Sequence, residues 1–150
     1  MKIGIASDHG GFELKEELKA FLKSRTLDPV DFGTFGKDSV DYPDFGAQVA
    51  ERVGRAELER GILICGTGIG MSIVANKFPG VRAALVHDLY SARFSREHNN
   101  ANILVMGGRI VGKELAKEIV ELWLKTPFSA GRHQNRLDKI TALEKKLLNI

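Results

Sequence analysis

The sequence has 150 residues, of which 43% are hydrophobic and 27% charged, a composition typical of one globular domain and not of a disordered or fibrous chain. The 22 Lys and Arg residues outnumber the 19 Asp and Glu residues only slightly, and acids and bases alternate, so nucleic-acid binding is disfavoured. The single cysteine excludes a disulfide framework and a zinc site of several thiolates. No apolar run approaches the roughly 20 residues of a membrane helix, and no signal peptide is recognisable. We therefore expect a cytoplasmic protein with one domain, residues 1–150, and no membrane association.

Short runs rich in Ile and Val alternate with longer amphipathic segments, a pattern typical of a parallel sheet covered by helices on both faces. The segments predicted as strands are 2–7, 30–33, 61–65, 82–86 and 102–106. The segments predicted as helices are 12–23, 42–56, 71–77, 88–96, 112–125 and 133–148. We expect an α/β, Rossmann-like three-layer sandwich with a five-stranded parallel sheet and an extra C-terminal helix. An apolar stripe on that last helix could pack on the rest of the chain or on a second copy; it consists of Leu137, Ile140, Leu143 and Leu147.

The segment 65–70, Cys-Gly-Thr-Gly-Ile-Gly, is the sharpest chemical signal in the sequence. It follows a predicted buried strand and precedes a helix, and ligands of such folds bind beyond the carboxyl ends of the strands. A thiol near a helix N-terminus ionises more readily, and glycines let backbone N–H groups approach an oxygen that gains negative charge. A lone buried cysteine is more often only a small hydrophobic residue. The glycine loop favours a reactive Cys65, with Thr67 able to hydrogen-bond the thiol or a substrate hydroxyl.

Two nucleotide-binding motifs also contain glycine loops, and neither fits this one. The dinucleotide fingerprint requires G-x-G-x-x-G after the first strand and an acidic residue about 20 positions later. Here the loop reads G-x-G-x-G and follows the third predicted strand. A Walker loop requires Gly-Lys-Ser/Thr, which does not follow. A nucleotide-binding module is therefore disfavoured.

Other polar residues lie near the expected ligand-binding edge or could bind an anion. Asp8 and His9 follow the first strand, where they could contact a sugar phosphate, although Asp8 could equally cap the next helix. Arg109 follows two glycines after the fifth strand. Arg132 and Arg136 are four residues apart on one helix face, which suits a phosphate, although a solvated basic face is the simpler interpretation.

His98 follows the helix after the fourth strand, so it is expected at the amino end of the sheet, away from Cys65 of its own chain. If His98 is catalytic, the simplest solution is a dimer in which it enters the other subunit's site. If it is structural, it only terminates the helix.

Together these motifs resemble those of the type B ribose-5-phosphate isomerases, a family that includes galactose-6-phosphate and allose-6-phosphate isomerases. The resemblance spans nearly the whole chain in family order. The matching segments are IASDHGGFELK (5–15), DYPDF (41–45), ICGTGIGMSIVANK (64–77), RAAL (82–85), REHNNANILVMGGR (96–109) and TPFSAGRHQNR (126–136).

The resemblance implies an aldose–ketose isomerase that interconverts D-ribose 5-phosphate and D-ribulose 5-phosphate, in the pentose phosphate pathway, through a cis-enediolate without metal or cofactor. It implies Cys65 as the base, since Met71 and Ser72 stand where another branch has a glutamate. It implies His98 as the proton donor that opens the sugar ring, with Asp8 and Thr67 as further catalytic residues. The positions that match substrate contacts are Asp8, His9, Tyr42, Gly66, Thr67, Gly68, Ile69, Gly70, Asn99, Arg109, Arg132 and Arg136. It also implies a homodimer or tetramer with sites shared between subunits.

Two other functions stay open at this point. A hexose-6-phosphate isomerase, for allose or galactose 6-phosphate, would differ in substrate length, which a panel of phosphorylated sugars separates. A non-catalytic sugar-phosphate sensor on the same fold would not exchange substrate hydrogen with solvent, and would not need Cys65, Thr67 and His98 together.

Overall fold

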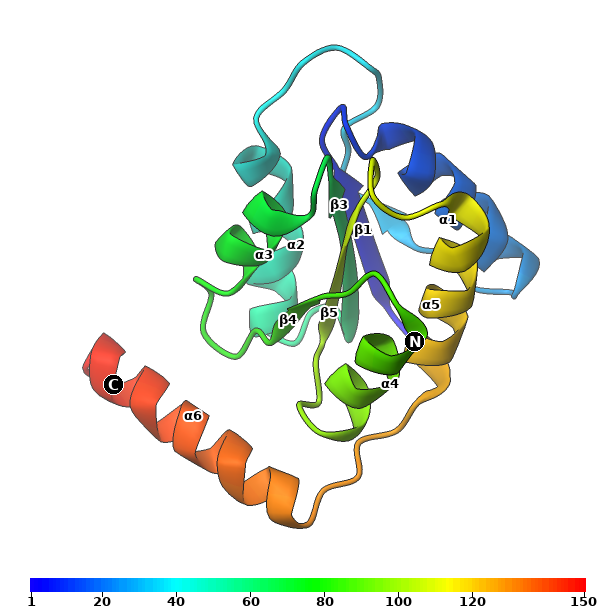
Figure 1. Cartoon of the computed structure of the whole chain (residues 1–150). Coiled ribbons are helices and arrows are strands. Elements are labelled where there is room, and N and C mark those ends of the chain that lie inside the picture. Colours follow the sequence, from blue (N-terminus) through cyan, green and yellow to red (C-terminus); the bar gives the residue numbers. More distant parts are fainter.

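A parallel sheet with helices on both faces forms the centre of the molecule (Figure 1), in a computed structural model that describes all 150 residues. The strands are β1 (Ile3–Ser7), β2 (Val30–Asp31), β3 (Arg60–Cys65), β4 (Ala83–Leu85) and β5 (Ile103–Gly107). The helices are α1 (Phe12–Ser24), α2 (Tyr42–Gly54), α3 (Ile69–Ala75), α4 (Leu89–Glu97), α5 (Lys113–Lys125) and α6 (Arg132–Leu148). The strands pair in parallel in the order β2-β1-β3-β5-β4. The predicted Rossmann-like fold with an extra C-terminal helix is confirmed.

The element boundaries differ from the predicted ones where side chains or glycines intervene. α3 begins at Ile69, inside the predicted loop, because Gly68 reverses the chain at φ 80° and already serves as the residue before the helix. β4 is shorter than predicted and lies at one edge of the sheet. The Asn76 side chain occupies this edge: its amide group donates to the Ala83 carbonyl at 3.0 Å and accepts from the Ala83 N–H at 2.9 Å. It therefore blocks pairing at an otherwise open edge.

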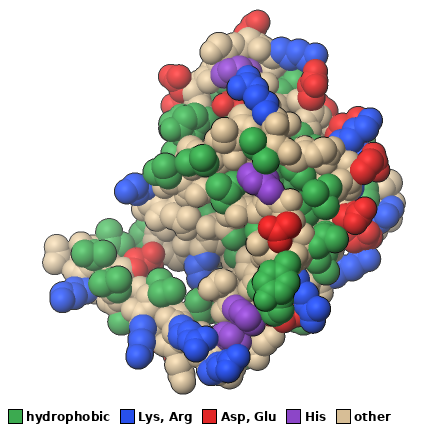
Figure 2. Space-filling model, viewed as in Figure 1, with side chains coloured by type: hydrophobic (Ala, Val, Ile, Leu, Met, Phe, Trp, Pro, Cys, Tyr) green, Lys and Arg blue, Asp and Glu red, His purple; other side chains and the backbone are tan.

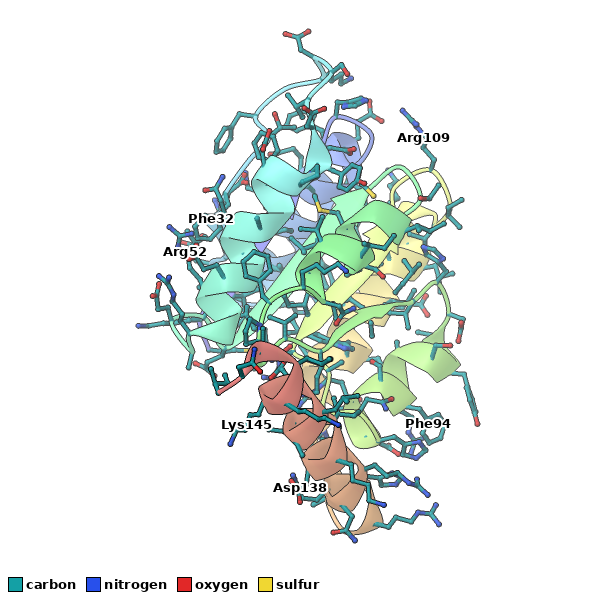
Figure 3. The ribbon with its side chains drawn as sticks, turned by 90° about the vertical axis from the view of Figure 1, so that its left-hand side faces the viewer. Phe32, Arg52, Phe94, Arg109, Asp138 and Lys145 are labelled. Atoms are coloured by element: carbon teal, nitrogen blue, oxygen red, sulfur yellow. The ribbon has the colours of Figure 1, made fainter.

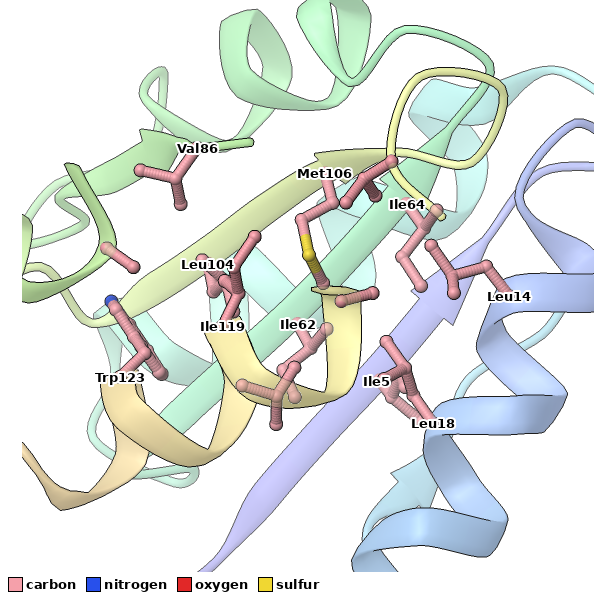
Figure 4. Packing of buried hydrophobic residues seen from close by; sticks show 14 of the residues in the cluster. Ile5, Leu14, Leu18, Ile62, Ile64, Val86, Leu104, Met106, Ile119 and Trp123 are labelled. Atoms are coloured by element: carbon pink, nitrogen blue, oxygen red, sulfur yellow. The ribbon is translucent and has the colours of Figure 1, made fainter. Parts of the chain in front are cut away.

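The alternation of side chains along the strands divides the core into two layers. On one face, residues such as Ile62, Ile64 and Leu104 pack under α1, α4 and α5 (Figure 4). On the other face, residues such as Leu63 and Cys65 pack under α2 and α3. Cys65 therefore ends β3 on the α2–α3 side of the sheet.

The last helix, α6, contacts the rest of the chain at few points, among them the His133 ring stacked on His98 and the Glu144 carboxylate, which accepts the Gly80 N–H at 3.1 Å. It extends along the amino end of the sheet, away from the central layers (Figure 1). Of the apolar stripe, Leu137 is buried, whereas Ile140, Leu143 and Leu147 are more than half exposed. Most of the stripe therefore does not pack on its own chain. No helix combines the length and apolarity needed to cross a membrane.

A buried ion pair connects α1 to the end of β2. The Lys15 side chain is fully buried, and its Nζ donates to both carboxylate oxygens of Asp31 at 2.7 Å. Asp31 also pairs with Lys19 at 2.7 Å and accepts the Gly33 N–H at 2.9 Å. Burial opposes the charge of Asp31, but the hydrogen bonds from Lys15, Lys19 and Gly33 outweigh it and lower the Asp31 pKa below 3.8.

We predict that Asp31→Asn lowers the free energy of unfolding by about 3 kcal/mol, because it leaves the buried Lys15 ammonium without its main counter-charge. Chemical denaturation measures this loss. Since the native pKa of Asp31 is lowered, its contribution to wild-type stability is present above the unfolded pKa and disappears as the pH falls through the native one. Glu13→Gln, which breaks the exposed pair with Lys37, serves as the control and should have little effect. Equal losses in the two variants would contradict this account.

Candidate active site

The carboxyl ends of β1 and β3 meet at the point where the strand order reverses, the usual ligand-binding place in such sheets. Asp8 directly follows β1, and its N–H donates to the carbonyl of Ile64 at 3.2 Å. Cys65 ends β3 next to Gly107 of β5. The three segments singled out from the sequence, after β1, β3 and β5, therefore lie together at this edge.

Cys65 is buried, and the loop that follows directs a backbone donor at its sulfur. The Gly68 N–H donates to Cys65 Sγ at 3.2 Å. Gly68 has φ 80°, and a Cβ at this position would lie 2.5 Å from Leu85 Cδ1 and 2.9 Å from the Met106 carbonyl carbon. Only glycine fits this turn without displacing its neighbours. The loop thus holds the sulfur in a fixed position at the carboxyl end of β3.

Thr67 and Tyr42 border this loop. Thr67 is exposed, and its Oγ1 accepts the Ile69 N–H at 3.3 Å. The hydrogen bond to the Cys65 sulfur comes from the Gly68 N–H and not from the Thr67 hydroxyl. The Tyr42 ring lies against Gly70, where a Cβ would come within 2.5 Å of the ring. Tyr42 therefore forms a wall of the region beside the start of α3.

Asp8 and His9 are both fixed by backbone N–H groups. Asp8 is buried, and its Oδ1 accepts the Gly11 N–H at 3.1 Å. It thus stabilises the turn before α1, and the helix itself has no side-chain cap. His9 Nδ1 accepts the Val40 N–H at 3.2 Å. A neutral imidazole in this arrangement carries its proton on Nε2, which can donate to a phosphate or hydroxyl oxygen.

Arg109 is carried by a turn that is bonded to the Cys65 loop. The Gly108 N–H donates to the Cys65 carbonyl at 2.8 Å, and the Arg109 N–H donates to the Gly66 carbonyl at 3.0 Å. The Gly107 N–H donates to His87 Nε2 at 2.9 Å. The Arg109 side chain is exposed, and its Nη1 lies 3.1 Å from where a Cβ on Gly66 would be. Its guanidinium therefore lies over the loop. The support of this turn by His87 has no signal in the sequence, because His87 stands outside the motifs that predict the site.

A second group of candidate residues lies at the amino end of the sheet. His98 and Asn99 follow α4, and Arg132 and Arg136 are on the first turns of α6. The His98 ring stacks on the His133 ring, with centroids 4.1 Å apart and planes at 14°. Histidines (purple) occur near both ends of the face in Figure 2, and Lys and Arg side chains (blue) gather around the lower ones. Burial, His98 and the two arginines lower the pKa of His133.

The predicted site is therefore divided into two clusters within one chain. The Cys65 cluster comprises Asp8, His9, Tyr42, Cys65, Gly66, Thr67, Gly68, Ile69, Gly70 and Arg109. The His98 cluster comprises His98, Asn99, Arg132 and Arg136. Figure 3 shows this separation, with Arg109 at the upper end of the molecule and Phe94 and Asp138, which flank the His98 cluster, at the lower end. The order of the elements predicts this separation for His98.

Neither cluster suggests a metal centre. The structure contains no group of three or more His, Cys, Asp and Glu side chains placed to hold a metal ion. The chemistry that the clusters can support is acid–base chemistry, with imidazoles, a carboxylate and a thiol, and anion binding by arginines and backbone N–H groups.

Comparison with known proteins shows the family to which the chain is similar. Residues 3–140 match the family described as Ribose/Galactose Isomerase. The chain is 49% identical to ribose-5-phosphate isomerase B of Escherichia coli, with 97% of each chain covered. It superposes on the Clostridium thermocellum ribose-5-phosphate isomerase B with TM-score 0.96 and 59% identity, covering 98% and 99% of the two chains. It superposes on the Mycoplasma genitalium ribose-5-phosphate isomerase B with bound ribulose-5-phosphate with TM-score 0.92 and 44% identity, and 96% of each chain is covered.

The family match covers most of the chain, and the relatives are similar over nearly their full lengths with the same fold. This chain is therefore a member of the ribose/galactose isomerase family, on the branch of the type B ribose-5-phosphate isomerases.

Proposed function

We propose that this protein is a single-domain ribose-5-phosphate isomerase, residues 1–150, that interconverts D-ribose 5-phosphate and D-ribulose 5-phosphate. The observation that carries the proposal is the Cys65 sulfur, which accepts a backbone N–H at the ligand-binding edge between β1 and β3. A sugar-phosphate binding protein without catalysis has no need of a thiol held in this way. The relative solved with ribulose-5-phosphate supports the choice of substrate.

The reaction begins with the cyclic sugar, whose ring must open before the carbon acid can react. His98 gives a proton to the ring oxygen as the bond between this oxygen and C1 breaks, and Asp8 assists by accepting the proton of the C1 hydroxyl. The product is the open-chain aldehyde, in which the carbonyl makes the hydrogen on C2 acidic.

The Cys65 thiolate then removes the proton from C2, and the electron pair moves through the C1–C2 bond to the carbonyl oxygen. Backbone N–H groups of segment 66–70 stabilise the resulting cis-enediolate. Thr67 passes a proton between the two substrate oxygens, and the thiol returns its proton to C1, which completes the ketose. No outside oxidant or reductant is needed, because C2 is oxidised as C1 is reduced: one hydrogen moves from C2 to C1 and one from the C2 oxygen to the C1 oxygen.

Anchoring the phosphate fixes C2 beside the sulfur and removes the entropic cost of finding this geometry during the reaction. We assign this role to His9, Arg109, Arg132 and Arg136. Because Arg132 and Arg136 lie with His98 at the other end of their own chain, a second subunit must bring them to the Cys65 cluster.

The proposal therefore includes a two-fold homodimer, in which each site combines the Cys65 cluster of one chain with the His98 cluster of the other. Exposed apolar side chains on α3, β4 and α4, the elements near both clusters, support such an association; they are Ile69, Ile73, Leu85, Leu89 and Tyr90. A tetramer would repeat the same dimer.

A base that must remain a free thiol suits a reducing compartment, so we place the enzyme in the cytoplasm.

We predict that Cys65→Ala slows isomerisation by about 100-fold or more, the usual contribution of a general base. Proton NMR in deuterated water should show no loss of the C2 hydrogen of ribose 5-phosphate. Binding of a non-reacting linear pentitol 5-phosphate, measured by calorimetry, should change little because the anchoring groups remain. Persistent exchange at C2 would remove Cys65 as the base, and absence of exchange in the wild type would favour a sensor.

Arg136→Ala is predicted to weaken binding of phosphorylated sugars about tenfold or more, since a charged hydrogen bond to the phosphate is lost. The measurement is KM for ribose 5-phosphate beside that for allose and galactose 6-phosphates, with Lys139→Ala on the same helix as the control. An unchanged KM would mean that Arg136 belongs to a solvated basic face. A wild-type preference for a six-carbon substrate would change the assigned substrate.

Mixing the Cys65→Ala and His98→Ala chains after unfolding, followed by refolding, should restore about a quarter of wild-type activity. Half of the dimers are then mixed, and each mixed dimer has one complete site. Each variant refolded alone is the control. Verified mixed dimers without recovered activity would show that each site is built within one chain.

A further inference from the structure

The turn that carries His98 and Asn99 is held by arginines that do not belong to either cluster. Arg96 lies on α4 and is only 3% exposed. Its Nη1 donates to Asn100 Oδ1 at 2.9 Å and to the Ala101 carbonyl at 2.5 Å. Asn100 has φ 45°, in the left-handed region that non-glycine residues adopt only when their surroundings hold them there.

Arg82, just before β4, holds the same turn from its other side. Its Nε donates to the Asn100 carbonyl at 3.0 Å, and its backbone N–H donates to Asn102 Oδ1 at 2.8 Å. The Asn102 amide in turn donates to the Gly80 carbonyl at 2.9 Å. The side chain and the carbonyl of Asn100 are therefore each bound by a different guanidinium.

The Arg96 guanidinium also reaches the segment that leads to Arg132 and Arg136. Its Nε donates to the Thr126 carbonyl at 3.3 Å, in the connection between α5 and α6. A second bond joins this connection to the end of α4, from the Ser129 N–H to the Glu97 carbonyl at 3.0 Å. One buried side chain thus contacts both segments that supply the His98 cluster.

Burial of the Arg96 charge destabilises the fold, since no carboxylate pairs with this guanidinium. Burial, together with the nearby Arg60 and Arg82, lowers the pKa of Arg96 to about 10, so it is still protonated at neutral pH. Arg96 and Arg60 both lie near the Trp123 ring, at 5.7 and 5.9 Å from its centroid. Arg60 donates to the Glu59 carbonyl and makes no bond to the turn. It is therefore a natural control for Arg96.

We propose that Arg96, assisted by Arg82, is a positioning residue. It sets the spacing between His98–Asn99 and Arg132–Arg136, the two parts of the His98 cluster that enters the other subunit's site. This inference rests on the proposed shared site. The planar fork of arginine can donate to the turn and to the Thr126 carbonyl together, whereas the single ammonium of lysine cannot span these acceptors. Arg96→Lys therefore keeps the positive charge but cannot hold the Asn100 turn and the Thr126 carbonyl at a fixed distance from each other.

We expect Arg96→Lys to lower kcat/KM for ribose 5-phosphate by about tenfold to 100-fold, as small misplacements of catalytic groups do. Arg82→Lys, at a partly exposed position, should show the same kind of defect to a smaller degree and serves if the buried variant does not fold. Arg60→Lys is the control and should keep wild-type kinetics. Thermal unfolding of all three variants measures their stability. Kinetics of Arg96→Lys and Arg82→Lys equal to those of Arg60→Lys would overturn the proposal.

Subunit mixing locates the defect. Arg96→Lys mixed with Cys65→Ala should gain activity over the separate chains, because the mixed dimer joins an intact Cys65 cluster to an intact His98 cluster. Arg96→Lys mixed with His98→Ala should gain none, since both carry their defect in the same cluster. If Arg96→Lys only lowered the stability of its own chain, mixing with Cys65→Ala and mixing with His98→Ala would give the same activity.

The outcomes separate the inference from the shared site on which it rests. A gain with His98→Ala, or no gain with Cys65→Ala while the Cys65→Ala and His98→Ala pair recovers activity, would overturn the positioning role alone. Failure of that pair itself would overturn the shared site and this inference with it.

Discussion

The hydrogen bond from the Gly68 N–H to the Cys65 sulfur, 3.2 Å long, is the interaction on which the proposed chemistry depends. It requires a buried strand that ends at the edge of the sheet and a chain reversal that only glycine adopts without strain. The reversal in turn places Thr67 outside and begins α3 at once. The β5 turn bonds to the same loop through the Cys65 and Gly66 carbonyls. Fold and reactive group are thus specified by the same few residues.

The parallel sheet also separates the two clusters of candidate site residues within one chain. Each helix that follows a strand returns the chain to the amino end, so the segment after α4 lies far from Cys65. His98, Arg132 and Arg136, to which we assign ring opening and phosphate binding, lie at that end, where the His98 ring stacks on His133 and the Ser129 N–H donates to the Glu97 carbonyl. The proposed association of two chains would bring the two clusters together, and activity would then depend on the spacing of residues within the His98 cluster. The buried Arg96, which donates to the Ala101 and Thr126 carbonyls with no carboxylate partner, is consistent with that need.

Much of this could be predicted from the sequence, for reasons that particular residues illustrate. The periodicity of apolar residues predicted the strands and helices, and the glycine loop after β3 identified the ligand-binding edge. The start of α3 was placed too late, because the left-handed conformation of Gly68 cannot be read from composition. The contacts that hold the site residues in place could not be predicted, because they depend on neighbours in the folded structure. They are the Gly107 hydrogen bond to His87, the Val40 hydrogen bond to His9 and the burial of Arg96. An arginine on an amphipathic helix looks the same whether it is solvated or buried.

The most direct test of the account is a crystal structure of the protein with a linear five-carbon sugar-phosphate mimic bound. The account predicts the Cys65 sulfur within about 3.5 Å of the second carbon, the distance expected for a reacting pair. It also predicts an imidazole from His98 of the partner subunit beside the first carbons, and the phosphate between arginines of both chains. A mimic bound away from the sulfur, or one contacted by residues of a single chain only, would contradict it.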